Sequence, residues 1–132
     1  MTVFVDTSAL IALLDASEAK HAACAKEWKR LLTADAAFVT SNYVMVETCA
    51  VAQRRLGMDA VRSLTIDFLP LLAVDWVDEP VHAAGHAAML TANRKELSLV
   101  DCVSFEIMRR RDLSTALALD NDFVDQGFSV VP

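Results

Sequence analysis

The chain has 132 residues, of which 55% are apolar and 23% are charged, and its formal net charge at pH 7 is −6. This length and composition suit one folded domain, residues 1–132, with a substantial core. The acidic balance argues against a broad basic surface for duplex nucleic acid. No apolar run reaches the ~20 residues that cross a bilayer, and no basic segment precedes the first apolar stretch as in a secretory signal. The three cysteines form no paired motif, so we expect reduced thiols and a cytoplasmic protein.

Strand and helix patterns alternate in the first half of the chain. In order, we expect a strand, two helices, a strand and a third helix at about residues 2–5, 8–16, 21–32, 36–40 and 42–56. Thr7 or Ser8 is placed to cap the first helix, since its hydroxyl can accept a hydrogen bond from a free backbone N–H group. Gly57 is placed to end the third helix, because glycine tolerates the left-handed conformation found there.

The alternation continues in the second half. We expect a helix, a strand, two further helices, a strand and a last short strand or tail at about residues 58–68, 71–77, 79–93, 98–111, 115–119 and 128–131. Pro70 ends the first of these helices, because proline has no N–H group to donate. Asp78 and Pro80 mark the start of the next one, as a cap and a first-turn proline.

This order of elements predicts the fold class α/β, with three layers (α/β/α) and a parallel sheet of four to five strands. Glycine and proline total six residues, too few for the many tight turns of an all-β sandwich. No internal repeat or linker divides the chain.

Four acidic residues stand in apolar surroundings: Asp6, Glu47, Asp101 and Asp120. A carboxylate placed in a core costs several kcal/mol unless a partner compensates it. No lysine or arginine lies close in sequence to Asp6 or Asp101. One divalent cation would compensate several carboxylates together, and hard oxygen ligands suit Mg²⁺ or Mn²⁺.

The expected fold brings these four residues to one edge. Asp6 and Asp120 end strands, and ligands of open α/β sheets bind beyond the carboxyl ends of the strands. Glu47 and Asp101 lie in the first turns of helices that begin near the same edge. A shared metal site at this edge is therefore our hypothesis.

Each acid also has a purely structural interpretation. Asp6 can cap the first helix, and Ser98 and Asp101 fit a capping box. Asp120 and Asp122 can form a turn, although the segment lacks the glycine and the terminal glutamate of a calcium-binding loop. Glu47 has the weakest such interpretation, because an isolated glutamate among apolar residues needs a buried partner.

Other functional motifs fit less well. His82 and His86 are four residues apart, but Ala83 stands where a zinc protease helix carries its glutamate. A phosphoacceptor receiver domain usually has an acidic pair after its first strand and a late lysine, both missing here. A phosphatase of the Asp-x-Asp type would need an acid at Ser8.

The sequence resembles the PIN-domain ribonucleases, and most closely the VapC-type toxins of toxin–antitoxin pairs. The resemblance covers essentially the whole chain. It rests on four segments in order, namely Val5–Leu10 (VDTSAL), Glu47 after the second strand, Leu97–Asp101 (LSLVD) and Ala118–Phe123 (ALDNDF) followed by Gly127 and Phe128. Each motif alone is weak, but four in this order are fairly specific.

The resemblance implies an endoribonuclease that uses Mg²⁺ or Mn²⁺, with Asp6, Glu47, Asp101 and Asp120 as its catalytic and metal-binding acids. Asp122 matches a position that is acidic in only some members. The resemblance further implies an RNA substrate, a cognate antitoxin that blocks the site, and a homodimer. The short apolar runs already predict that the protein has no membrane attachment. The alternatives that remain are a catalytically silent binding module on the same fold and an acidic-pocket signalling domain.

Overall fold

The structure, a computed structural model, describes residues 1–132. Its centre is a five-stranded sheet in which every neighbouring pair of strands is parallel. The strands are β1 (Thr2–Val5), β2 (Ala37–Ser41), β3 (Leu72–Asp75), β4 (Thr115–Leu117) and β5 (Ser129–Val131). Their order across the sheet is β3-β2-β1-β4-β5. The predicted α/β class and parallel sheet are confirmed.

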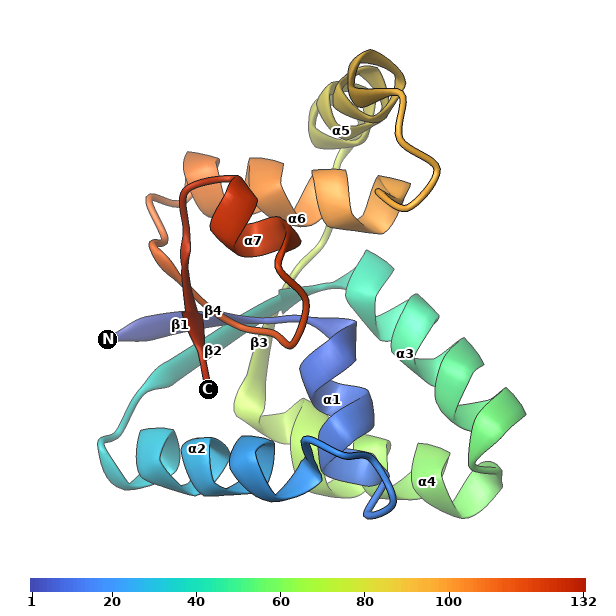
Figure 1. The fold of residues 1–132 in the computed structure, drawn as a ribbon, viewed down its shortest axis with the longest axis vertical. Helices are drawn as coiled ribbons and strands as arrows, with labels where there is room; N and C mark the ends of the chain where they lie inside the picture. The colour runs from blue at the N-terminus through green and yellow to red at the C-terminus, as the bar shows by residue number, and fades with distance from the viewer.

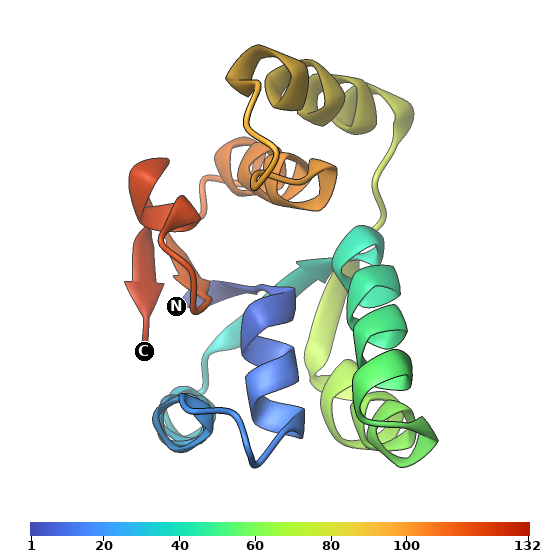
Figure 2. The same ribbon diagram turned by 45° about the vertical axis from the view of Figure 1, so that its right-hand side comes forward.

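Helices cover both faces of this sheet (Figures 1 and 2). They are α1 (Thr7–Leu14), α2 (His21–Thr33), α3 (Asn42–Arg55), α4 (Met58–Ser63), α5 (Glu79–Ala92), α6 (Leu99–Arg110) and α7 (Asp122–Asp125). The chain runs from β1 to β3 in one direction with α1 to α4 on one face. It then crosses back past β1 to β4, with α5 to α7 on the other face. Right-handed crossovers between parallel strands account for this division.

A core of 24 buried residues fills both interfaces between helices and sheet. Val3, Phe4 and Val5 of the central strand are fully buried because helices cover both of its faces. On one side the Trp28 ring stacks on Phe38 of β2, with 4.4 Å between ring centroids. All three cysteines are free thiols, and no helix has the length and apolar character needed to span a bilayer.

The structure corrects several predicted boundaries. Asp6, rather than Thr7 or Ser8, is the N-cap of α1, which ends at Leu14. The helix expected at residues 58–68 ends as an α-helix at Ser63, and a π-helical turn and a 3₁₀ turn carry the chain to Leu71. Pro70 explains why no α-helix continues through this last turn, because a residue without an N–H group cannot extend the α-helical hydrogen bonds.

The other differences concern two strands and the segment after β4. The strand expected at residues 71–77 is shorter, and the strand expected at 115–119 ends at Leu117. A short helix, α7, forms where the sequence indicated only a turn. Phe123 explains it, because its ring is fully buried and packs edge-on against Phe105, with 5.0 Å between centroids. This burial orders a segment whose polar residues are typical of turns.

Candidate active site

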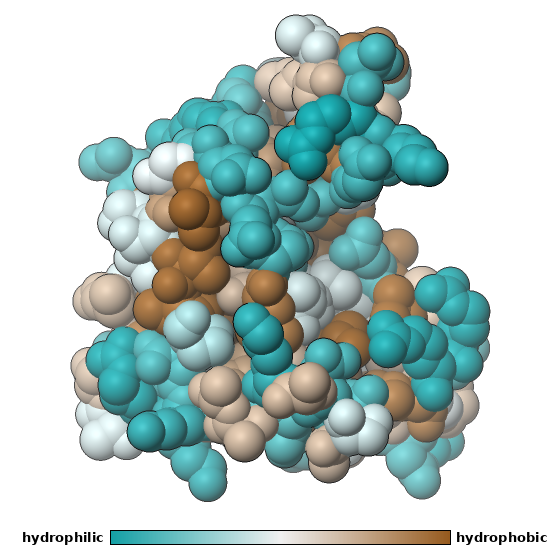
Figure 3. Space-filling view, viewed as in Figure 1, coloured by the Kyte–Doolittle hydropathy of each residue, from teal (hydrophilic) through white to brown (hydrophobic).

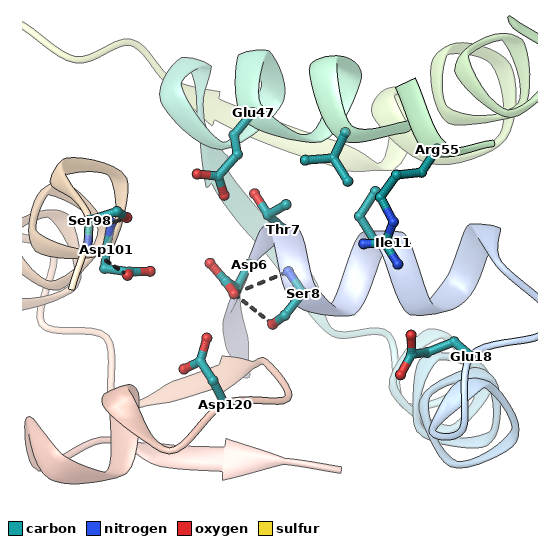
Figure 4. Close-up of a pocket in the computed structure, with 11 residues that line it drawn as sticks. Asp6, Thr7, Ser8, Ile11, Glu18, Glu47, Arg55, Ser98, Asp101 and Asp120 are labelled. Carbon is teal, nitrogen blue, oxygen red and sulfur yellow. Dashed lines mark hydrogen bonds between the residues drawn. The ribbon is translucent and has the colours of Figure 1, made fainter. Parts of the chain in front are cut away.

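A cavity of about 390 Å³ opens at the carboxyl edge of the sheet, between the beginnings of α1 and α6 and the face of α3 that runs from Glu47 to Arg55. It lies beside β1 and β4, the neighbouring strands from which the chain winds in opposite directions. Open α/β sheets bind ligands at such a point, because the flanking connections diverge and leave a crevice. The space-filling view shows the surface hollowed between the part formed by α5 and α6 and the part formed by α3 (Figure 3). The four predicted acids all line the cavity (Figure 4).

Asp6 is the most buried of the four, with 3% of its surface exposed. Its Oδ2 atom accepts hydrogen bonds from the Ser8 backbone N–H at 3.2 Å and from the Ser8 hydroxyl at 2.6 Å. Burial raises the pKa of Asp6 to about 7, against the lowering effect of the Ser8 hydrogen bonds and with the help of the neighbouring Asp120 and Asp101 charges. Asp6 is therefore a buried acid that lacks a positive partner.

Asp101 lies in the first turn of α6 and forms the predicted capping box with Ser98. Its Oδ2 accepts from the Ser98 N–H at 3.1 Å, while the Ser98 hydroxyl accepts from the Asp101 N–H at 3.0 Å. Burial raises the pKa of Asp101 in spite of these hydrogen bonds. The capping box fixes the carboxylate at the wall of the cavity.

Asp120 lies beyond the end of β4, in a turn. Its Oδ1 accepts a hydrogen bond from the Asp122 N–H at 3.2 Å. Burial, followed by the charge of Asp101, raises the pKa of Asp120, and Glu47 contributes in the same direction. The carboxylates on opposite walls of the cavity thus repel one another, and a bound cation would relieve this repulsion.

Glu47 reaches the cavity from α3 (Figure 4). The inner face of α3 is held to α1 by a hydrogen bond from the Thr48 hydroxyl to the Thr7 hydroxyl, 3.2 Å long. Ser41 caps α3, accepting from the Val44 N–H at 3.1 Å. Neither carboxylate oxygen of Glu47 has a hydrogen-bonding partner in the protein, so its charge faces the cavity without compensation.

The structural and functional interpretations of these acids are compatible, because each carboxylate can serve both roles at once. Asp6 and Asp101 use Oδ2 for capping, and Asp120 uses Oδ1 for its turn. Each of these carboxylates keeps its other oxygen free, and no fully buried polar side-chain atom lacks a partner. The free oxygens are therefore accessible from the cavity, and the caps orient them.

Asp122 is not brought into the cavity with the other four. Its Oδ1 lies 3.6 Å from the Arg94 guanidinium, an ion pair at the surface. Its charge still helps to raise the pKa of Asp101. His82, whose spacing from His86 resembled a zinc motif, pairs with the Tyr43 hydroxyl instead.

Two charged residues of the cavity were not identified from the sequence. Glu18 comes from the loop after α1, and Arg55 from the last turn of α3. The polar sequence around Glu18 gives no sign that this residue lines a cavity. Arg55 carried a usable signal, because Glu47, Val51 and Arg55 follow at intervals of four and so share one helix face.

Comparison with known families decides the relationship. The PIN domain family matches residues 3–128, nearly the whole chain. The chain belongs to the PIN domain family. This confirms the resemblance drawn from the four acidic segments.

Similar PIN proteins include an endonuclease toxin. The chain is 32% identical over 127 residues to the 23S rRNA-specific endonuclease VapC20 of Mycobacterium tuberculosis, covering 96% of this chain and 95% of that protein. The crystal structure of VapC20, described as a Sarcin-Ricin loop cleaving toxin, covers 98% of this PIN domain and 99% of its own chain with a TM-score of 0.83. This PIN domain is thus a homologue of a VapC-type endonuclease toxin.

Two more distant structures share the fold. VapBC2 from Rickettsia felis, bound to a DNA fragment from the promoter, has 12% identity and a TM-score of 0.71, and covers 98% of this chain and 97% of its own. FitAcB from Neisseria gonorrhoeae has 18% identity and a TM-score of 0.71, and covers 100% and 97%. At these identities they support the fold alone.

Proposed function

We propose that this PIN domain is a metal-dependent endoribonuclease and the toxin of a toxin–antitoxin pair. The observation that carries the proposal is the convergence of four carboxylates, each with at least one free oxygen, on one cavity. A single basic residue, Arg55, lines the same cavity. Such a set of hard, anionic oxygen ligands selects a divalent cation.

The donor set fits Mg²⁺ or Mn²⁺. No three acidic, histidine or cysteine side chains are drawn together into a closed coordination shell. Mg²⁺ does not need one, since it keeps several waters and takes only one or two carboxylates. Asp6 and Asp101 are the residues we assign to hold the ion, because their caps fix them in place, with Asp120 beside them. A bound cation would neutralise phosphate charge and make water easier to deprotonate.

Glu47 is suited to receive the proton of the attacking water. Both of its oxygens are free, and it faces Asp6 across the cavity (Figure 4). The water oxygen bonds to phosphorus in line with the leaving 3′ oxygen, the bond between phosphorus and that oxygen breaks, and the leaving oxygen takes a proton from solvent water. The products carry a 5′ phosphate and a 3′ hydroxyl. Asp120 contributes negative charge that holds and orients water in the cavity.

RNA that is single-stranded at the cleavage site is the substrate class we favour, because unpaired bases can turn aside and let the backbone enter a small cavity. The 23S rRNA specificity in the name of the related VapC20 supports RNA over DNA. The net charge of −6 is consistent with a protein that contacts a short stretch of RNA backbone rather than a long stretch of duplex.

The test is incubation of the purified protein with total RNA in Mg²⁺, in Mn²⁺ and in chelator. We expect fragments with 5′ phosphate and 3′ hydroxyl ends in metal and intact RNA in chelator. Cleavage that leaves 2′,3′-cyclic phosphate ends, or that persists in chelator, would exclude this mechanism.

The toxin assignment has its own test. A ribonuclease active on the host's RNA needs restraint, and the related VapC20 is described as a toxin, so we expect an antitoxin as the partner of this chain. An arginine or lysine of that partner could enter the acid cavity, since a guanidinium pairs with carboxylates. Expression of the wild type should slow growth, and Asp6→Asn at equal protein level should not. We also expect a homodimer, measurable by light scattering.

A further inference from the structure

We propose that Arg55 forms a phosphate subsite for the RNA strand, beside the acids that act on the cleaved bond. The inference rests on the proposed ribonuclease function and extends it to substrate binding. Arg55 is the single cationic side chain among the residues that line the cavity. It lies in the last turn of α3, two turns beyond Glu47 on the same face, so about 12 Å of helix separates the two positions.

Arg55 is free to bind a ligand. Five of the eight arginines form ion pairs within 4.0 Å, namely Arg30, Arg62, Arg94, Arg110 and Arg111, and Arg109 donates to Gln126. Arg54 and Arg55 alone form no such pair or hydrogen bond. Of these two, only Arg55 lines the cavity (Figure 4).

A purely structural role does not account for this position. Arg54 and Arg55 both complement the negative end of the α3 dipole, so Arg54 would suffice for that purpose. Arg55 exerts an electrostatic effect on Asp15, but the two side chains form no ion pair. The Asp15 carboxylate instead accepts a 2.6 Å hydrogen bond at Oδ1 from the Ser17 hydroxyl. Glu18 stands across the cavity without closing an ion pair on Arg55 (Figure 4).

A phosphate subsite would offset the electrostatic repulsion between the acidic cavity and the RNA backbone. Carboxylates that hold a cation repel the phosphates before and after the cleaved one. A guanidinium at the end of the cavity offsets this repulsion and can grip a phosphate with two parallel hydrogen bonds. The contact is to the backbone, so it affects all RNA sequences alike.

Binding is measured first, in the Asp6→Asn background, so that RNA is not cut. A fluorescently labelled single-stranded RNA of mixed sequence is titrated at several salt concentrations, with Arg55→Ala compared with Arg54→Ala as the matched control. We expect Arg55→Ala to weaken binding about tenfold and to reduce the slope of log K against log salt by about 0.7, the value for one phosphate of a single strand. Arg54→Ala should change neither by as much.

Cleavage kinetics in the wild-type background give the second readout. Arg55→Ala should raise KM with little change in kcat, because a remote phosphate contact is made equally before and during the reaction. Arg55→Lys should recover part of the loss, and Glu18→Gln should lower KM by removing a repulsive charge. A structural role of Arg55 would change melting temperature and kcat instead of the salt slope.

The outcomes separate this inference from the proposed function. If the wild type cleaves RNA and Arg55→Ala equals Arg54→Ala in affinity and salt slope, the subsite is refuted and the ribonuclease stands. If the wild type does not cleave RNA and the Asp6→Asn protein does not bind it, both proposals fail. A reduced salt slope confined to Arg55→Ala establishes the subsite.

Discussion

The Ser8 hydroxyl donates a 2.6 Å hydrogen bond to Asp6 Oδ2 and is thereby the closest partner of the most buried acid in the site. The same hydroxyl oxygen accepts a 3.0 Å hydrogen bond from the Leu119 N–H. One side chain thus ties the end of β1 to the segment after β4, the two places from which Asp6 and Asp120 enter the cavity.

Ser8→Ala should therefore lower both activity and stability. The Leu119 N–H loses its acceptor and Asp6 loses a donor, which costs about 1–3 kcal/mol of unfolding free energy. Cleavage should fall roughly tenfold as the two carboxylates lose their alignment. Ser17→Ala is the matched control, because Ser17 makes the same pair of contacts to Asp15 at the surface. Equal activity of the two variants would rule out this positioning role.

Metal should stabilise the folded protein through the acid cavity. A ligand that binds only the folded state raises the melting temperature with its concentration. We expect Mn²⁺ to raise the melting temperature of the wild type, and Asp6→Asn and Asp101→Asn to abolish most of that rise. Asp67→Asn, at an exposed position outside the cavity, is the control. A wild-type response that stays flat up to millimolar Mn²⁺ would contradict a metal site.

The pH dependence of metal-free stability tests the burial of Asp6. Its pKa is raised from 3.8 to about 7, so between these values the folded state holds a proton that the unfolded state releases. The contribution of Asp6 to the free energy of unfolding must therefore fall as the pH rises from about 4 to about 7, and it must stay constant above pH 7. In chelator, Asp6→Asn should be more stable than the wild type at pH 8 and lose this advantage by pH 4. Parallel pH curves for the two proteins would show that Asp6 titrates normally.

Gly85→Ala tests how closely α5 packs on α6, the helix that carries Asp101. A Cβ at Gly85 would lie 2.5 Å from Val103 Cγ2 and 3.1 Å from the Val103 backbone nitrogen. Helix propensity alone predicts a gain of about 0.5–1 kcal/mol for this change, but overpacking costs about 1–3 kcal/mol. We expect net destabilisation by denaturant unfolding, whereas Ala87→Gly, at an exposed site of the same helix, reports propensity alone. A more stable Gly85→Ala variant would contradict the close approach.

The sequence was sufficient to predict that the four acids gather at one edge of the sheet, because local pattern and fold agree there. Asp6 and Asp120 follow apolar strands, and the alternation of elements already implied a parallel sheet with a shared carboxyl edge. The capping interpretations of Asp6 and Asp101 were also right, because caps depend on neighbouring residues only. The same hydrogen bonds hold these carboxylates toward the cavity, so the two interpretations did not compete.

The parts that were missed depend on tertiary packing. Phe123 orders α7 by burying its ring. The polar residues beside it predicted only a turn. Glu18 and Arg55 enter the cavity because the loop after α1 and the last turn of α3 meet there, and charged residues at such places are usually solvated. Asp122 turned outward to Arg94, a pairing between residues 28 positions apart in sequence that no local pattern indicates.

The most direct test is RNA cleavage measured against Mn²⁺ concentration for the wild type and Asp6→Asn, prepared alike and stripped of metal. The four-carboxylate cavity predicts no cleavage in chelator, wild-type cleavage that rises and saturates with Mn²⁺, and none by Asp6→Asn at any concentration. Cleavage by Asp6→Asn at the wild-type rate, or by the wild type in chelator, would contradict the account.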